Sequence, residues 1–389
     1  RDANVGRGEL SQKDRRRDKG DGRENDDEDD DEDEGVRVQT HFEISAASGA
    51  QKEEKKAPPV TIDLLGTLRA KFEYQPGEGD ARFQVRNARF GVAGEIYSKL
   101  AYCMEIDLSD EGKIKMVNAY LGTKLYKGLG FTIGYSYGSF MDLSALPPTI
   151  DFAGPNGSAF YRTTQLSYMC DKLKNWKFGV SMEMPSVDGT TNNDLSINTQ
   201  RMPDFATSVQ YNWNSSSHVK LGAIVRRMTY SSNVHEKAYS ATGFGLQAST
   251  TFNITKKLQA FGQFNYGKGI GSYLNDLSNL NVDIVPNPDE AGKMQALPML
   301  GWYAGLQYNI SPKVFLSSTY SMSRLYSENG YPANEPSTYR YGQYFVANLF
   351  WNVTPNMQVG AEYLRGWRTN FDNSTNHANR MNLLVQYSF

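Results

Sequence analysis

The chain has 389 residues, 39% of them hydrophobic, with a mean hydropathy of −0.57 and a formal net charge of −2. No apolar run approaches the roughly 20 residues that a transmembrane helix needs, which excludes such a helix. Two Cys and four His residues are too few and too scattered to predict a disulfide framework, a metal site or a bound cofactor.

The first 59 residues differ in composition from the rest. They contain the acidic run GRENDDEDDDEDEG and hold 12 of the 41 basic and 18 of the 43 acidic residues. Such a segment cannot bury enough apolar surface to offset chain entropy, so we predict that residues 1–59 are disordered. Residues 60–389 then carry a net charge of +4.

Apolar and polar residues alternate from residue 60 onward. In VTIDLLGTLRAKFEY the even positions are apolar or small, whereas the odd positions include Asp63, Arg69 and Lys71. The same split recurs in KLAYCMEIDL, in WKFGVSMEM and in the final nine residues, MNLLVQYSF. A period of two predicts strands with one apolar face, because a helix would scatter these residues around its circumference.

The connections between these segments alternate in length. Seven are tight, at 97–99, 126–129, 171–175, 214–218, 255–257, 311–313 and 354–356. Eight are mostly longer, at 75–81, 109–112, 138–160, 185–200, 229–240, 268–296, 326–341 and 368–376. Seven tight turns and eight loops predict sixteen strands.

Sorting of the loops by length favours a membrane barrel over a soluble sandwich or propeller. A transmembrane barrel places its apolar face in lipid and has short turns at one end and long loops at the other. Trp176, Trp213 and Trp351 lie beside tight turns and Trp367 lies at a long-loop end, as expected for two interfacial girdles. We therefore predict an all-β fold: a sixteen-stranded antiparallel barrel over residues 60–389, with short periplasmic turns and long extracellular loops.

The C-terminus fits such a barrel. Val385, Tyr387 and Phe389 share one face of the last predicted strand. In a closed barrel this strand pairs with the first, near Val60, and lipid covers its apolar face. The terminal Phe with alternating apolar partners resembles the outer-membrane assembly signal that the barrel insertion machinery reads.

Several separated motifs resemble the DcaP-type porins. They are GYSYGSFMDLSALPPTIDFAGPNGSAFYRTTQLSY, FNYGKGIGSYLNDL, RNARFGVAGEI, VGAEYLRGWR and the Phe389 ending. The resemblance implies a homotrimeric channel in the outer membrane of a Gram-negative bacterium, associated with dicarboxylates and related small anions. Relatives often carry a coiled-coil segment ahead of the barrel, whereas residues 1–59 show no apolar heptads.

The third long loop, 138–160, is the expected constriction, because the third loop of porins folds inward. Asp142 and Asp151 are its only charges, and Arg162 follows its end. Its Pro and Gly residues fix a non-helical backbone course. A surface loop with no role in conduction remains the alternative.

Charged residues of polar parity should line the lumen opposite this loop. The basic set is Arg69, Lys71, Arg89, Lys220, Arg226 and Arg380, and the acidic set is Glu95, Glu105, Asp107 and Glu362. Rows of charge set selectivity in wide pores, and the basic set is the larger, so we predict a weak anion preference. The alternative is that these charges pair and merely hydrate the lumen. The parity could slip by one residue at a bulge, notably around 82–90 and 224–230.

No catalytic constellation is recognisable. We expect His218 to lie in a tight turn, and we find no Ser and acid partner for any His in the sequence. No nucleic-acid partner is expected.

The predicted function is a passive porin for small hydrophilic, preferably anionic solutes. The alternative is a barrel that presents loops 268–296 and 326–341 for adhesion or partner binding. The acidic N-terminal segment should be periplasmic, either as a solvated linker or as a binder of cations, basic proteins or the pore mouth.

Overall fold

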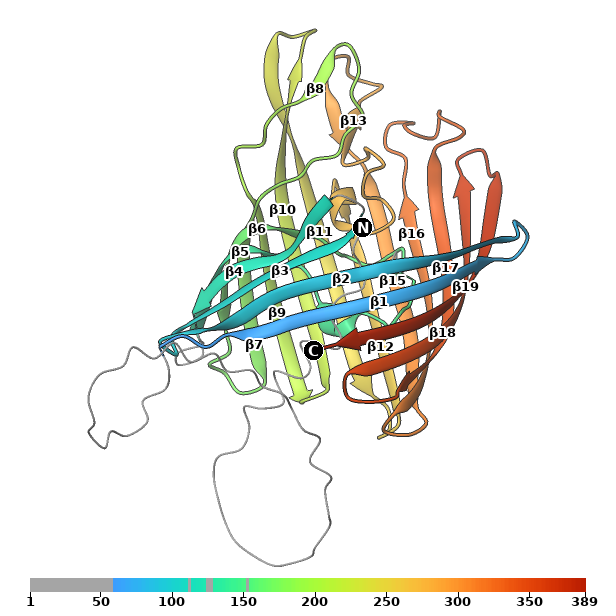
Figure 1. The fold of residues 1–389 in the computed structure, drawn as a ribbon. Helices are drawn as coiled ribbons and strands as arrows, with labels where there is room; N and C mark the ends of the chain where they lie inside the picture. The colour runs from blue at the N-terminus through green and yellow to red at the C-terminus, as the bar shows by residue number, and fades with distance from the viewer. Residues whose placement is uncertain (1–58, 111–112, 124–128, 152–153) are drawn as a thin grey trace, which may run out of the picture.

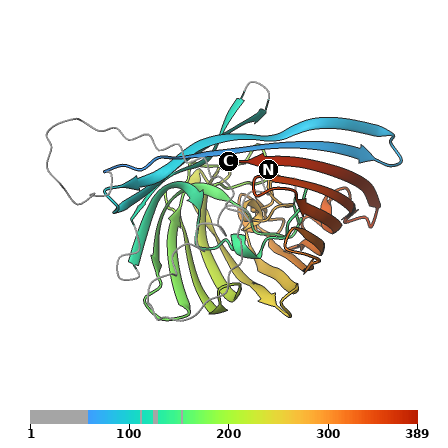
Figure 2. The same cartoon turned by 60° about the horizontal axis from the view of Figure 1, so that its bottom comes forward.

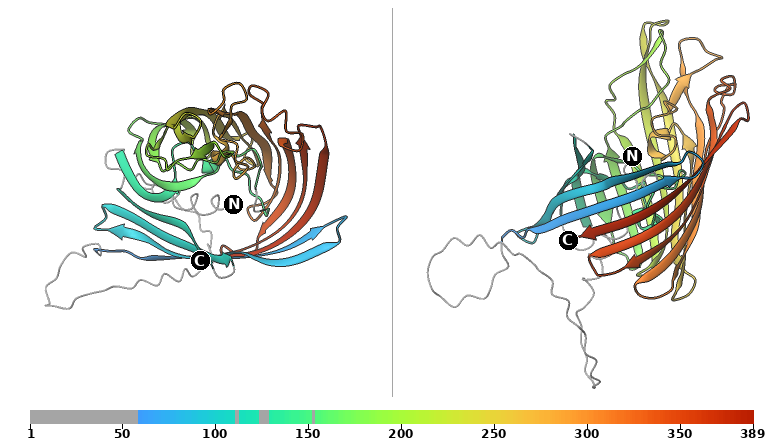
Figure 3. Two further views of the ribbon diagram at one scale, coloured as in Figure 1. Left: turned by 90° about the horizontal axis from the view of Figure 1, so that it is seen from above. Right: turned by 45° about the vertical axis from the view of Figure 1, so that its right-hand side comes forward.

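The structure, a computed structural model, describes residues 59–389 except 111–112, 124–128 and 152–153. The predicted disordered segment 1–59 thus lies outside the described residues apart from Pro59. The long strands form one antiparallel sheet that closes where β1 (Asp63–Gln75) pairs with β19 (Thr375–Ser388). Seen from above, the strands curve around a central space that contains the loops of one side (Figure 3). No described helix is long and apolar enough to cross a membrane.

Sixteen long strands make the barrel, as predicted. The fourteen between β1 and β19 are β2 (Asp80–Ile96), β3 (Leu100–Asp110), β4 (Lys113–Thr123), β5 (Leu129–Tyr137), β6 (Arg162–Cys170), β7 (Trp176–Glu183), β9 (Asp204–Asn214), β10 (Ser217–Ser232), β11 (Lys237–Asn253), β12 (Leu258–Lys268), β15 (Pro298–Asn309), β16 (Val314–Leu325), β17 (Tyr339–Asn352) and β18 (Met357–Asn370). The short elements are η1 (Leu143–Ala145), β8 (Leu195–Ile197), η2 (Gly271–Tyr273), β13 (Ile284–Pro286) and β14 (Met294–Ala296).

The connections sort by end, with short turns at the lower end and β8 and β13 at the upper end in Figure 1; Figure 2 brings the lower end forward. Of the seven predicted tight turns, only the one at 126–129 lies mostly outside the described residues. The predicted loops at 75–81, 229–240 and 368–376 are wrong in length, because the strands continue to turns at 76–79, 233–236 and 371–374. Polar residues interrupt the period of two at these positions, although Tyr230 still packs inward in an apolar cluster, and the backbone pairing continues.

The two faces of β19 show how the alternation is used. Leu383, Val385, Tyr387 and Phe389 point outward, and each remains about half exposed on the isolated chain. Asn382 and Leu384 on the other face are buried. The Leu that interrupts the alternation therefore points inward, against Ile150 and Phe350.

The last residue is held by the first strand. The N–H of Phe389 donates to the carbonyl of Gly66, and that of Gly66 to the carbonyl of Phe389, both at 3.0 Å. The Phe389 ring covers Gly66 so closely that a Cβ there would lie 2.0 Å from the ring Cζ. Glycine at this position therefore allows the terminal ring to pack against the first strand. Whether the insertion machinery reads Val385, Tyr387 and Phe389 stays a prediction.

One of the two suspected parity slips is present. The β1–β2 ladder pairs Arg69 with Asn87 but Ala70 with Val85, which leaves Arg86 as an extra residue. Beyond this bulge the odd positions of β2, including Asn87 and Arg89, are buried. The β10–β11 ladder runs in unbroken register from His218 to Ser232, so the slip suspected at 224–230 does not occur.

Candidate functional site

The connection between β5 and β6, residues 138–161, crosses the interior of the barrel. Its backbone meets inward side chains of strands on the far wall: Thr251 donates to Ser144 O at 3.0 Å, Tyr303 to Ala145 O at 2.9 Å and Asn348 to Pro148 O at 2.8 Å. Lys220 also donates to the carbonyl of Met141. The described part of the loop thus lies against β10, β11, β15 and β17 in turn.

Asp142 fixes the first part of this loop. Its carboxylate accepts from the Oγ of Ser144 at 2.7 Å and of Ser249 at 2.5 Å, and lies 2.8 Å from Nε2 of His218. Burial on its own raises the pKa of Asp142, but the contacts with His218, Lys220 and Ser249 outweigh it and leave the pKa below its ordinary value. Ionised Asp142 therefore holds the loop to β10 and β11.

Our expectation for His218 was wrong. The residue lies on β10 and faces inward, and it has both a carboxylate and a hydroxyl within reach. Asp142 and Ser144 both approach the same ring nitrogen, Nε2, at 2.8 and 3.4 Å. A Ser-His-Asp relay needs the acid on one ring nitrogen and the nucleophile on the other, so this cluster does not have the geometry of a triad.

The Asp142 anchor predicts a specific acid sensitivity. Its folded pKa lies below the unfolded value, so the carboxylate stabilises the fold above about pH 3.9. That contribution is lost as the pH falls below this value toward the folded pKa. We expect Asp142→Asn to lower the free energy of unfolding at pH 7 and to lower it by a smaller amount at pH 3, where part of the contribution of the carboxylate is already lost. Urea unfolding in phosphatidylcholine vesicles at both pH values measures the difference, and an equal effect at both would contradict the anchor.

A second anchor holds the tip of the loop. The backbone N–H groups of Ile150 and Asp151 donate to the two oxygens of Glu362, at 2.6 and 2.7 Å. The Asp151 carboxylate accepts from Tyr344 at 3.0 Å and pairs with Arg380 at 3.2 Å. Glu362 thus acts as an acceptor for the loop backbone on the wall of β18.

The returning limb of the loop lies directly on the backbone of the wall. A Cβ on Gly157 would lie 2.2 Å from the carbonyl oxygen of Met322 and 2.5 Å from the amide nitrogen of Trp302. The N–H of Gly157 donates to Ser321 Oγ at 2.9 Å. Glycine is required at this position, because any side chain would push the loop off β15 and β16.

A second long connection, residues 269–297, also fills the interior. Ile270, Tyr273, Leu274 and Leu277 are fully buried and pack with Phe140 of the first loop in one apolar cluster. The carbonyl of Tyr273 accepts from the N–H of Phe160 at 2.8 Å. This packing leaves little of the connection free to act as an adhesive surface.

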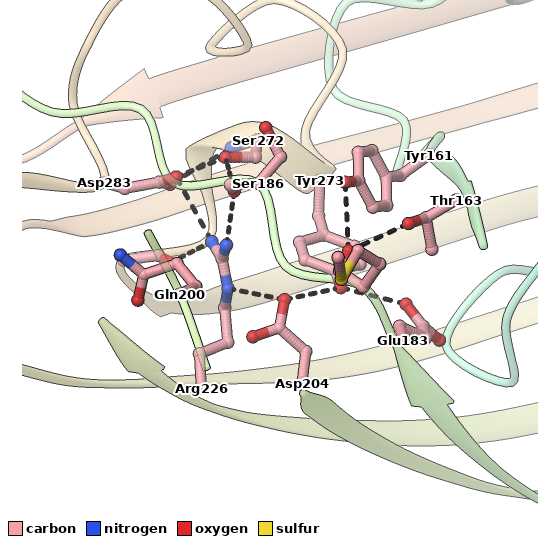
Figure 4. A network of polar contacts seen from close by, with 12 residues as sticks. Tyr161, Thr163, Glu183, Ser186, Gln200, Asp204, Arg226, Ser272, Tyr273 and Asp283 are labelled. Carbon is pink, nitrogen blue, oxygen red and sulfur yellow. Dashed lines mark hydrogen bonds and ion pairs between the residues drawn. The ribbon is translucent and has the colours of Figure 1, made fainter. Parts of the chain in front are cut away.

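A buried polar network joins this connection to the wall. Figure 4 shows the Arg226 guanidinium between Asp204 and Asp283, with ion-pair distances of 3.0 and 3.2 Å. Arg226 also donates to the carbonyls of Gly269 (2.8 Å) and Ser186 (2.6 Å), so it binds two loops at once.

Tyr273 completes the network beside Arg226. Its hydroxyl lies 2.9 Å from carboxylate oxygens of both Glu183 and Asp204. Burial, and next the two carboxylates, raise the pKa of Tyr273 well above its ordinary value, so the phenol remains a neutral donor.

The predicted wall residues divide by exposure. Lys71, Arg89, Arg226, Glu105, Asp107 and Glu362 are buried, whereas Arg69, Glu95, Lys220 and Arg380 are half-buried. Several are brought together in ion pairs: Lys71 with Glu73 at 2.7 Å, Arg89 with Asp107 at 3.1 Å and Arg380 with Glu73 at 3.2 Å. Arg162 lies apart from them, with its guanidinium over the rings of Tyr137 and Phe160 at 4.7 and 5.9 Å.

Sequence reasoning missed several inward charges. Glu73, Glu183 and Asp204 are buried on the inner face, and Lys177 and Arg368 share inward parity with Glu183 and Glu362. The alternation that identified the other wall residues could have found them. With these residues included, basic wall residues barely outnumber acidic ones. The two sets differ in exposure, because most of the acidic residues are buried and most of the basic ones are not.

Comparison with known proteins locates this architecture among outer-membrane porins. No family model and no curated sequence matches the chain. By structure it is similar to the outer membrane channel DcaP of Acinetobacter baumannii, with 18% identity, a TM-score of 0.72, and coverage of 85% of this chain and 97% of that one. The resemblance expected from the sequence is thereby confirmed at the level of the fold.

Two other outer-membrane protein structures are similar at lower scores. The trimer form of OmpT, an outer membrane protein of Vibrio cholerae, gives 13% identity and a TM-score of 0.56, covering 85% of this chain and 99% of that one. An anion-selective porin from Comamonas acidovorans gives 10% identity and a TM-score of 0.56, covering 85% and 100%. The protein therefore has the fold of a DcaP-like sixteen-stranded porin.

Proposed function

We propose that the protein is a bacterial outer-membrane porin through which small hydrophilic solutes diffuse passively. The observation that carries the proposal is the closed barrel with an apolar exterior, whose polar interior is crossed by the loop 138–161. Loops pinned to the inner wall restrict passage without any covalent step, which fits a channel better than an enzyme. The trimer form of OmpT supports a homotrimeric assembly for this chain as well.

We propose that the loop 138–161 is the constriction, with Asp142 and Asp151 as its anchors. The inward carboxylates Asp142, Asp151, Glu105, Asp107 and Glu362 are buried in contacts with the wall or loop. Arg69, Lys177, Lys220 and Arg380 keep part of their surface, and Arg368 is exposed. A solute in the pore therefore meets more basic than acidic surface, which supports a weak anion preference.

The adhesion alternative has less support. The connection 269–297 is largely buried, and 7 of the 13 residues of the connection 326–338 are exposed. We also propose that the segment 1–59 is periplasmic. The barrel assembly machinery would recognise the C-terminal strand.

Reversal potential in a salt gradient tests both conduction and selectivity. We expect the wild type to conduct with a modest anion preference. Lys177→Glu should shift the reversal potential toward cations, because it replaces an inward, half-buried cation by an anion. Lys172→Glu, exposed in the turn after β6, is the matched control and should shift it much less. A folded barrel that does not conduct would favour the adhesion reading, and a cation preference in the wild type would overturn the anion claim.

A further inference from the structure

The outer wall has an opening in its strand pairing near the upper end of β10. Between β8, which pairs with Tyr230 to Ser232, and β9, which pairs from Val225 downward, the backbone of residues 199–203 leaves the wall. The Gln200 amide bridges the gap: its Oε1 accepts from the N–H of Thr229 at 2.8 Å and its Nε2 donates to the Thr229 carbonyl at 3.0 Å. A side chain thus substitutes for a strand backbone.

A cavity of about 790 Å³ lies at this opening on the outside of the barrel. Its apolar lining includes Met182, Met202 and Phe205, each between 42% and 45% exposed. Its charged lining consists of Arg201 and Arg227, both exposed, and no Asp or Glu lines it. The site therefore combines an apolar wall with two cations.

The position of the cavity along the barrel matches the edge of the membrane. Outward residues of β10 are apolar from Val219 to Val225 and become polar from Arg227 onward. On β9, Phe205 lies eight residues above Trp213, which is roughly 26 Å along the strand. With the strand tilted by about 40°, that separation corresponds to roughly 20 Å of height, which is most of the apolar band of such barrels, about 25 Å tall. Above this level the β10–β11 hairpin continues upward beside the short strand β8 (Figure 1).

We propose that this cavity binds a phosphate-bearing lipid of the outer leaflet. Acyl chains would lie on Met182, Met202 and Phe205, and the phosphate would accept hydrogen bonds from Arg201 and Arg227. Charge complementarity favours an anionic headgroup, since guanidinium groups bind phosphate through paired N–H donors. The apolar lining beside the two cations distinguishes a lipid from a free anion.

Binding of fluorescent diphosphoryl lipid A to the full chain in neutral phosphatidylcholine bicelles tests the proposal. Each of Arg201→Gln and Arg227→Gln should weaken binding about fivefold, and the double variant should weaken it about thirtyfold. Each substitution removes the attraction of one cation for the lipid phosphate, and the two effects multiply. Arg365→Gln, an outward arginine over the ring of Trp367, is the matched control and should bind as the wild type does. Dephosphorylated lipid should bind the wild type as weakly as lipid A binds the double variant.

Three results would overturn the proposal. Equal lipid A binding by the wild type and the double variant would show that the two arginines do not bind the lipid. Equal weakening by Arg365→Gln would indicate general surface charge. Displacement of lipid A by millimolar inorganic phosphate would indicate a free-anion site. Heat-modifiable migration of every variant on gels confirms that the barrel is folded before binding is measured.

Discussion

Replacing Arg226 by Met is expected to lower the free energy of unfolding by about 3–5 kcal/mol, because it leaves the buried carboxylates of Asp204 and Asp283 without their cation. Arg226 is 1% exposed and also holds the carbonyls of Gly269 and Ser186. Its loss should therefore detach the connection 269–297 as well. Urea unfolding in phosphatidylcholine vesicles measures the cost.

The neighbouring residue provides the matched control. Arg227 is adjacent in sequence but points outward and is exposed, so Arg227→Met should change stability by no more than about 0.5 kcal/mol in neutral lipid. Adding Asp204→Asn and Asp283→Asn to Arg226→Met should recover part of the loss, since neutral amides remove the unpaired charges. A similar cost for Arg226→Met and Arg227→Met would show that the network does not stabilise the barrel.

Replacing Glu362 by Leu is expected to release the tip of the loop 138–161. The substitution leaves the N–H groups of Ile150 and Asp151 without their acceptor, at about 1–3 kcal/mol for each buried donor. Because the tip lies across the lumen, we expect larger and noisier single-channel conductance steps together with the lower stability. Conductance in planar bilayers and urea unfolding give the two readouts.

Glu328→Leu serves as the control for loss of a carboxylate. Glu328 pairs with Lys268 at 2.8 Å, but both side chains are about one-third exposed, so the expected cost is within about 1 kcal/mol and conductance should not change. If Glu362→Leu folds and conducts as the wild type does, the loop is not held by Glu362 and the proposed constriction loses its anchor.

The strand count was predictable because it depends on a local property. Each strand in contact with lipid must alternate, so Leu383, Val385 and Tyr387 reveal their outward face without reference to any other part of the chain. The prediction failed where this constraint ends. Above the apolar band the outward residues of β10 are polar from Arg227 onward, whereas its inward Tyr230 is buried in an apolar cluster with Leu195 and Ile284, and the strands continue there without a clear period of two.

The site was predictable only in part. Asp142, Asp151 and Glu362 were identified from loop position and parity, but their partners were not. Pairs such as Asp142 with His218 and Ile150 with Glu362 join residues 76 and 212 positions apart, and nothing in either local sequence specifies the other.

The sequence by itself determined the class of fold, because alternation and loop length are set by lipid and water acting on each segment separately. The tertiary structure decided which charges are exposed in the lumen and which are buried. Glu183 and Asp204 carry the same inward parity as Lys177, yet the connection 269–297 covers the two carboxylates and leaves the lysine half-buried. Burial of a charge depends on what packs over it, and that is fixed only when distant loops meet inside the closed barrel.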